Sequence, residues 1–113
     1  MAVGKEYIVH RDPCGGVRVL VSDRFAGYRF LLPETSQRHR MFSESFQMGD
    51  LSGGAKQLAM AILLEELRDP RQAENLCRGF ADDFTSKWAK GYVVIHSKDI
   101  QEWVSNRKVA VFV

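Results

Sequence analysis

The chain has 113 residues, which is enough for one domain with one hydrophobic core. Apolar residues make up 45% of the sequence and charged residues 27%, and these proportions exclude an intrinsically disordered chain. The 16 basic and 14 acidic residues leave a formal charge of +2, a smaller basic excess than dedicated nucleic-acid binders usually show.

Nothing in the sequence indicates export or a membrane span. The chain has no apolar stretch of about 18 residues, and its N-terminus lacks the apolar core of a signal peptide. The chain has only two cysteines, Cys14 and Cys77, and this low number favours reduced thiols; a single disulfide between them is the alternative. We therefore expect a cytoplasmic protein.

The first third of the chain predicts antiparallel strands. Residues 5–10 and 17–21 are β-rich runs, and the turn residues between them, which include Gly15 and Gly16, favour a hairpin. Residues 28–32 predict a third strand, which Pro33 ends.

About 20 residues then precede the next predicted element, too many for a bare loop in a compact domain. The polar residues 34–40 predict an exposed excursion. A fourth strand is predicted over residues 41–47 because apolar side chains recur there at even spacing, at Phe42, Phe46 and Met48.

The second half of the chain predicts helices. Ser52 precedes a helix over residues 55–67, and the seven consecutive apolar residues 58–64 imply that most sides of this helix are buried. Asp69 fits the N-cap of a second helix, Pro70 its first position and Gln72 the reciprocal capping position. This second helix carries an apolar stripe at helical spacing, made of Ala73, Leu76, Cys77, Phe80, Ala81, Phe84 and Trp88.

The C-terminal part predicts a strand or extended link over residues 92–95 and a short last helix capped by Ser97. Ile100, Trp103 and Val104 face inward in that helix. Residues 109–113 are strongly β-prone, and they are expected either to join the sheet or to form an exposed end. The whole pattern predicts one α+β domain over residues 1–113. An N-terminal antiparallel sheet of three or four strands packs on two or three C-terminal helices.

The glycine-rich segment before the first long helix resembles the signature loop of ATP-binding-cassette ATPases. The likeness is limited to Leu51-Ser52-Gly53-Gly54 and the following Lys56. No phosphate-cradling Gly-x-x-x-x-Gly-Lys-Ser/Thr loop follows a strand, and no apolar strand ends in a magnesium-binding Asp. ATP hydrolysis is therefore rejected. We expect no enzyme activity, no cofactor and no catalytic residue.

Two interpretations of this segment remain open. The free N–H groups at the helix start, with Ser52, Gly53, Gly54 and Lys56, could bind a phosphate or carboxylate. Alternatively, Ser52 caps the helix and the glycines allow a tight turn and a close approach of the chain. Capping alone explains every residue and is favoured.

Residues 46–64 resemble a small family of phage- and plasmid-borne domains of unknown function. That family carries a Gly-Ser-Gly-Pro loop that leads into an Ala-Gln-Leu-Ala-Leu-Ala-Ile-Leu helix. The matching residues are Gly49, Gly54, Gln57, Leu58, Ala59, Ala61, Ile62 and Leu63.

The likeness extends to Tyr-Ile-Val-His-Arg at residues 7–11 and to Ile-x-x-Trp at Ile100 to Trp103. Met48, Asp50 and Ala55 depart from the family, which has Trp, Tyr and Pro at these places. The resemblance implies a mobile-element origin and supplies no catalytic residues.

Two clusters of polar residues remain. His10, Asp12 and Cys14 contain too few ligands for a closed metal site, and we interpret them as a surface hairpin without a bound metal. Arg38, His39 and Arg40, followed by Met41 and Phe42, form the one dense basic spot. A loop on a rigid scaffold commonly carries binding, so these five residues are the candidate partner-binding site.

We therefore expect a small non-catalytic accessory protein of a phage or mobile element, located in the cytoplasm of the host cell. It binds a host protein or complex through the region of residues 34–54, and inhibition of a defence system is one form of this activity. The alternative is binding of a phosphate-bearing ligand or nucleic acid at Ser52, Gly53, Gly54 and Lys56, together with the nearby basic residues. Homo-oligomerisation stays open, and no membrane partner is expected.

Overall fold

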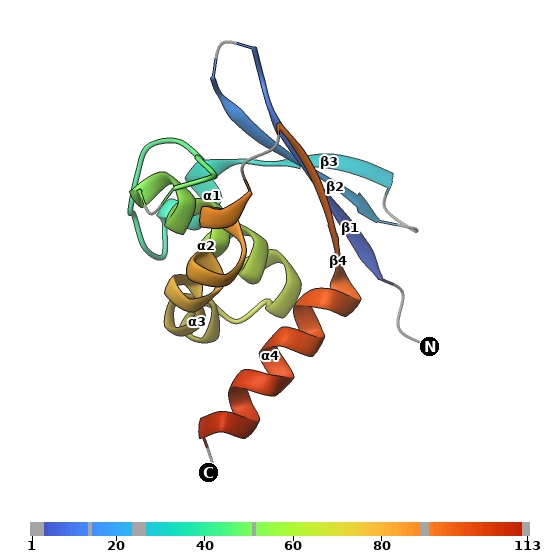
Figure 1. The fold of residues 1–113 in the computed structure, drawn as a ribbon, viewed down its shortest axis with the longest axis vertical. Helices are drawn as coiled ribbons and strands as arrows, with labels where there is room; N and C mark the ends of the chain where they lie inside the picture. The colour runs from blue at the N-terminus through green and yellow to red at the C-terminus, as the bar shows by residue number, and fades with distance from the viewer. Residues whose placement is uncertain (1–3, 14, 24–26, 51, 89–90, 112–113) are drawn as a thin grey trace.

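The computed structural model describes residues 4–13, 15–23, 27–50, 52–88 and 91–111, with side chains described through Arg107. These residues form a sheet with helices on one of its faces, as the predicted α+β class requires (Figure 1). In chain order the elements are β1 Lys5–Arg11, β2 Val17–Asp23, β3 Gly27–Leu31, α1 Pro33–Gln37, α2 Gly53–Leu67, α3 Pro70–Asp83, the 3-10 helix η1 Thr85–Lys87, β4 Tyr92–His96 and α4 Ser97–Val111.

The sheet is antiparallel throughout and has the strand order β3-β2-β1-β4. Val9 in the central strand β1 lies opposite Val19 of β2 and Val93 of β4. Side chains alternate between the two faces of a strand, so every second residue points toward the helices. The sheet residues buried in this way are Tyr7, Val9, Val17, Val19, Val21 and Ile95.

The opposite face of the sheet carries an apolar row across all four strands. Phe30, Leu20, Ile8 and Val94 are neighbours in the pairing register. Tyr28 and Phe30 are 70% and 55% exposed, so this face lies outside the core. The third predicted strand is confirmed, and its aromatic face points away from the helices.

Helix α2 lies at the centre of the core, as its apolar sequence predicts. Eight of its side chains and Gly54 are buried. The hydroxyl of Ser52 caps its start by accepting the N–H of Ala55 at 3.4 Å. Arg68 ends it in the left-handed conformation, with φ of 54°.

Helix α3 starts at the predicted cap. The Asp69 carboxylate accepts the N–H groups of Arg71 and Gln72, and Pro70 occupies the first turn. Gln72 donates its amide to the Asp69 carboxylate at 3.1 Å rather than reaching the cap backbone. The apolar stripe packs on α2 and, through Phe80 and Phe84, on the Trp103 ring of α4.

The prediction of a strand over residues 41–47 is wrong. The fourth strand of the sheet is β4, which pairs with β1 at the edge far from β3. Phe46 and Met48 are buried because this irregular segment covers the start of α2. Their even spacing therefore reflects core contacts of a loop and not a period-2 strand.

Three further predictions need correction. Residues 34–40 are not wholly an exposed excursion, because α1 begins at Pro33 and buries Ser36. The helix with the apolar stripe ends at Asp83, and η1 follows it. Residues 109–111 continue α4, so they do not join the sheet. Residues 112–113 lie outside the described part of the chain, as does Cys14.

Within the described ranges, we find no helix whose length and apolar character would let it cross a membrane.

Candidate functional site

The predicted partner-binding residues follow α1 and lie on the surface. The backbone N–H groups of His39 and Arg40 each donate to the carbonyl of Ser36 at 3.1 Å, which turns the chain outward. Arg38, His39, Arg40 and Met41 are exposed, and the Met41 side chain reaches 56% exposure. Residues 38–42 therefore place three basic side chains beside an apolar one.

A single buried side chain holds this loop in place. Gln57 of α2 is completely buried, and its Oε1 accepts the backbone N–H groups of Phe42 at 2.6 Å and of Ser43 at 3.1 Å. Its Nε2 donates to the Ser36 hydroxyl at 2.8 Å and to the Arg40 carbonyl at 3.1 Å. A fully satisfied buried amide of this kind makes the loop part of the core framework.

Contacts on the surface add to this restraint. The Arg40 guanidinium lies 5.2 Å from the centre of the Phe42 ring and 3.6 Å from the Glu74 carboxylate of α3. The Gln37 side chain donates to the Ser43 carbonyl at 2.9 Å. Phe42 itself is half-buried and packs against the core. Phe42 thus anchors the loop, whereas Arg38, His39 and Met41 present its surface.

The glycine-rich segment is explained by close approach of the chain. A Cβ on Gly53 would lie 2.5 Å from the Phe42 carbonyl oxygen, and one on Gly54 would lie 2.6 Å from Cβ and Cγ of Gln47. Both positions therefore exclude a side chain where residues 42–47 cross the start of α2. The Thr85 hydroxyl, also buried, donates to the Ala55 carbonyl at 2.9 Å and ties the same turn to η1.

A carboxylate already lies beside this helix start. Asp50 accepts the Ser52 N–H at 3.0 Å, and its hydrogen bonds to Ser52 lower the pKa of the Asp50 carboxyl. An ionised carboxylate next to a helix N-terminus interacts favourably with the helix dipole and repels a second anion. Lys56 lies in the first turn and is half-buried.

The structure also contains a polar network that the sequence analysis missed. At the end of α2, Glu66 accepts the hydroxyl of Tyr7 at 2.8 Å, the hydroxyl of Ser97 at 2.7 Å and the amide of Gln101 at 2.7 Å. These contacts join β1, α2 and α4. The sequence signal for this network is the acidic pair Glu65 and Glu66, which directly follows the apolar residues 58–64.

The neighbouring Glu65 is engaged by two cations. Lys5 donates to it at 2.7 Å, and Arg29 forms a second, very short contact. Burial opposes ionisation of Glu65, but the hydrogen bonds from Arg29 and Lys5 outweigh it and lower the pKa of this carboxyl. Burial, together with the charge and hydrogen bond of Glu66, raises the pKa of Tyr7 far above its ordinary value.

The polar residues of the first hairpin form surface ion pairs. Asp12 lies 3.3 Å from the His10 imidazole and 3.1 Å from the Arg18 guanidinium. Among the described residues, no group of three or more His, Cys, Asp or Glu side chains is arranged to hold a metal. Cys77 is buried, and its thiol donates to the Glu74 carbonyl at 3.2 Å.

The fold and the site together define a small α+β scaffold in which a buried amide fixes the exposed basic loop of residues 38–42. Residues 11–106 match the family described as "Family of unknown function (DUF6166)", and the chain belongs to this family. Searches of curated proteins and of solved structures each found no match.

Proposed function

We propose that this protein is a non-enzymatic binding module that contacts a host protein or complex through residues 38–42. The observation that carries the proposal is the pair of hydrogen bonds from Phe42 and Ser43 to the buried Gln57 amide. They fix the shape of an exposed loop before any partner is present. A loop ordered in advance loses less conformational entropy on association.

The chemistry of the loop supports a protein partner. Arg and Met are enriched at protein interfaces, and Arg38 and Met41 are both exposed on this loop. Three basic side chains with an apolar one fit an acidic surface that also offers an apolar pocket. The origin on a phage or mobile element and the inhibition of a defence system belong to this proposal, and their support is the sequence resemblance around residues 46–64.

Affinity capture tests the proposal. A tagged wild-type protein and the Arg38→Ala/Met41→Ala variant are used to capture partners from host lysate, and the identified partner is then titrated in purified form. The Arg78→Ala variant, which removes an exposed basic side chain from α3, is the matched control. We expect the double variant to weaken binding by at least about tenfold and the control to bind like wild type. Equal binding by all three proteins would show that the binding surface does not include Arg38 and Met41.

Binding of a phosphate-bearing ligand or nucleic acid at Ser52 to Lys56 is the alternative. The packing of residues 42–47 over the two glycines and the ionised Asp50 weigh against it. The position of the contact separates the two proposals, because a basic interface at residues 38–42 would itself weaken with ionic strength, as phosphate binding does. Amide shifts at Gly53 to Lys56 on addition of phosphate would support the alternative.

A further inference from the structure

A groove of about 460 Å³ runs along the β4 edge of the sheet, away from residues 38–42. Three consecutive residues of β4, Val93, Val94 and Ile95, line it. Successive side chains of a strand point to opposite faces, so a groove that touches all three follows the edge of the strand. Its other walls come from Phe84 and Trp88, which flank η1, and from α4, which contributes Trp103.

The pairing of β4 with β1 determines which backbone groups face this groove. The N–H of Arg11 donates to the Gly91 carbonyl at 2.8 Å, so these opposite residues form a hydrogen-bonded pair. Such pairs alternate along an antiparallel ladder, which places Val93 and Ile95 in the pairs that bond to β1. Tyr92 and Val94 therefore direct their N–H and C=O groups away from β1.

β4 is an edge strand, since no described strand pairs with its outer side. The next outward group along the edge, the His96 N–H, already donates to the Asp99 carboxylate at 3.3 Å. Tyr92 and Val94 thus present two donors and two acceptors in a row beside an aromatic groove, with no hydrogen bond from these groups to another described residue. An edge of this kind is a template for an added strand.

We propose that the β4 edge and its groove bind an extended peptide segment of a partner protein, in which basic and apolar residues alternate. The segment adds as a fifth strand to Tyr92 and Val94. The side chains on one face of the added strand enter the groove and lie against Trp88 and Trp103.

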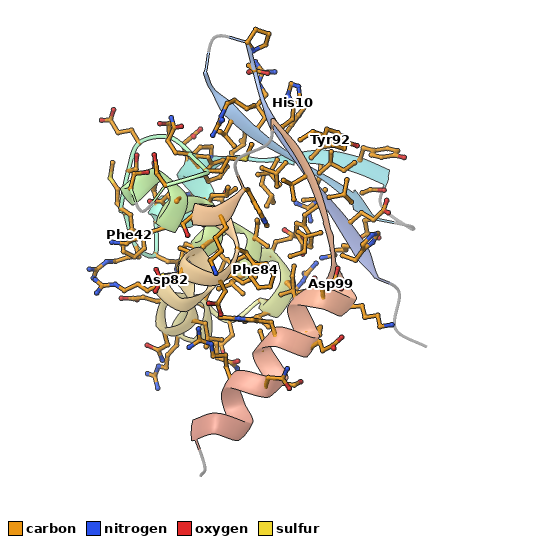
Figure 2. All side chains as sticks on the ribbon, viewed as in Figure 1. His10, Phe42, Asp82, Phe84, Tyr92 and Asp99 are labelled. Atoms are coloured by element: carbon orange, nitrogen blue, oxygen red, sulfur yellow. The ribbon has the colours of Figure 1, made fainter. Side chains whose placement is uncertain are left out.

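The charge of the groove selects the peptide. Asp99 and Glu102 line it on the α4 side, and no basic residue is among the described residues that line it (Figure 2 shows Asp99 at the start of α4 and Phe84 between α3 and β4). A Lys or Arg of the added strand would therefore meet a carboxylate. The β4 strand of a second copy of this chain would bring no Lys or Arg to the groove, because its sequence is Tyr-Val-Val-Ile-His.

This surface does not depend on residues 38–42, and Figure 2 places Phe42 and Tyr92 at opposite sides of the view. The Arg38→Ala/Met41→Ala variant should therefore bind the peptide as wild type does. Failure of one proposal leaves the other intact.

The test is an NMR titration of the full chain with three blocked peptides. The first is Lys-Val-Lys-Val-Lys, the second is Glu-Val-Glu-Val-Glu, and the third is the basic peptide N-methylated at its three central residues, which removes hydrogen-bond donors from both of its edges. We expect the basic peptide to shift the amides of Tyr92 and Val94. N-methylation should weaken its binding about threefold or more, because at least one backbone hydrogen bond to β4 is lost. The acidic peptide should not bind.

Variants of the chain provide a second arm. Val94→Pro removes an outward N–H without breaking the ladder to β1 and should weaken the basic peptide about tenfold, whereas Val94→Thr keeps the N–H and should not. Glu102→Gln should weaken it about threefold. Three results would overturn the proposal: no β4 shifts at millimolar peptide, equal binding of the N-methylated peptide, or a concentration-dependent dimer that Val94→Pro abolishes.

Discussion

The Oε1 atom of Gln57 accepts the backbone N–H of Phe42 at 2.6 Å, and this contact joins the centre of the core to the exposed basic loop of residues 38–42. The two residues are 15 positions apart in the sequence. Because Gln57 lies on the buried helix α2, the geometry of the loop follows that of the core. A partner would therefore meet a surface that is already shaped.

Gln57→Leu should loosen the loop and destabilise the fold. The substitution removes both acceptor and donor, which leaves the Phe42 and Ser43 N–H groups without their partner and should cost about 3 kcal/mol of unfolding free energy. Chemical denaturation measures the cost. Hydrogen exchange should accelerate at Phe42 and Ser43 by more than at Val9 and Val19 in the sheet, which serve as the internal control. Uniform acceleration at all four amides would contradict the role given to Gln57.

Gly54→Ala should destabilise the protein, although alanine is the better helix former by about 1 kcal/mol. The added Cβ would lie 2.6 Å from carbon atoms of Gln47 and 2.9 Å from its backbone nitrogen, so the crossing segment must move. We expect a net loss of at least about 1 kcal/mol in chemical denaturation. Gly16→Ala is the control, because its Cβ would meet only Asp12 at an ordinary 3.6 Å. A Gly54→Ala protein as stable as wild type would revive the anion interpretation of this glycine.

Stability should fall in alkali because of Tyr7. Its pKa in the folded protein is raised above the ordinary value of 10.0, first by burial and then by Glu66. Above that pH the unfolded chain loses the Tyr7 proton and the folded chain retains it, so the free energy of unfolding decreases as pH rises. Urea denaturation across this range should show the decline, and Tyr7→Phe should make it shallower. Parallel profiles for the two proteins would show that Tyr7 does not titrate as described.

Stability should also fall in acid because of Glu65. The contacts from Arg29 and Lys5 lower the pKa of this carboxyl below its ordinary value of 4.5. Its contribution is present above pH 4.5 and is lost as pH falls through the lower folded-state pKa. Glu65→Gln should flatten the acid limb of the stability profile. If the acid limbs of variant and wild type have the same slope, another carboxylate is responsible.

Much of the fold is predictable from local sequence signals. The hairpin of β1 and β2, the Ser52 and Asp69 caps and the burial of α2 all follow from spacing, turn residues and helix-capping chemistry. Each of these features depends on residues close together in the chain, which is why the pattern is sufficient.

Features that depend on distant residues are not predictable in this way. Phe42, Phe46 and Met48 alternate as a strand would, but their burial comes from crossing α2, and the fourth strand is supplied by β4 some 50 residues later. Gln57 gives only a weak signal, a polar residue inside an apolar helix. Its partners become apparent only once the loop is in place. The basic residues of the sequence identify the candidate loop, but the hydrogen bonds that hold the loop in place cannot be identified from the sequence.

The affinity of the purified partner for Gln57→Leu, measured where the variant remains folded, tests most directly whether the shape of residues 38–42 determines binding. Arg38, His39 and Met41 are all retained in this variant, so the side chains that would contact the partner are unchanged while the loop loses its restraint. We predict a loss of affinity of at least about tenfold relative to wild type, because the loop must then be ordered on binding. Affinity equal to that of wild type would contradict the account.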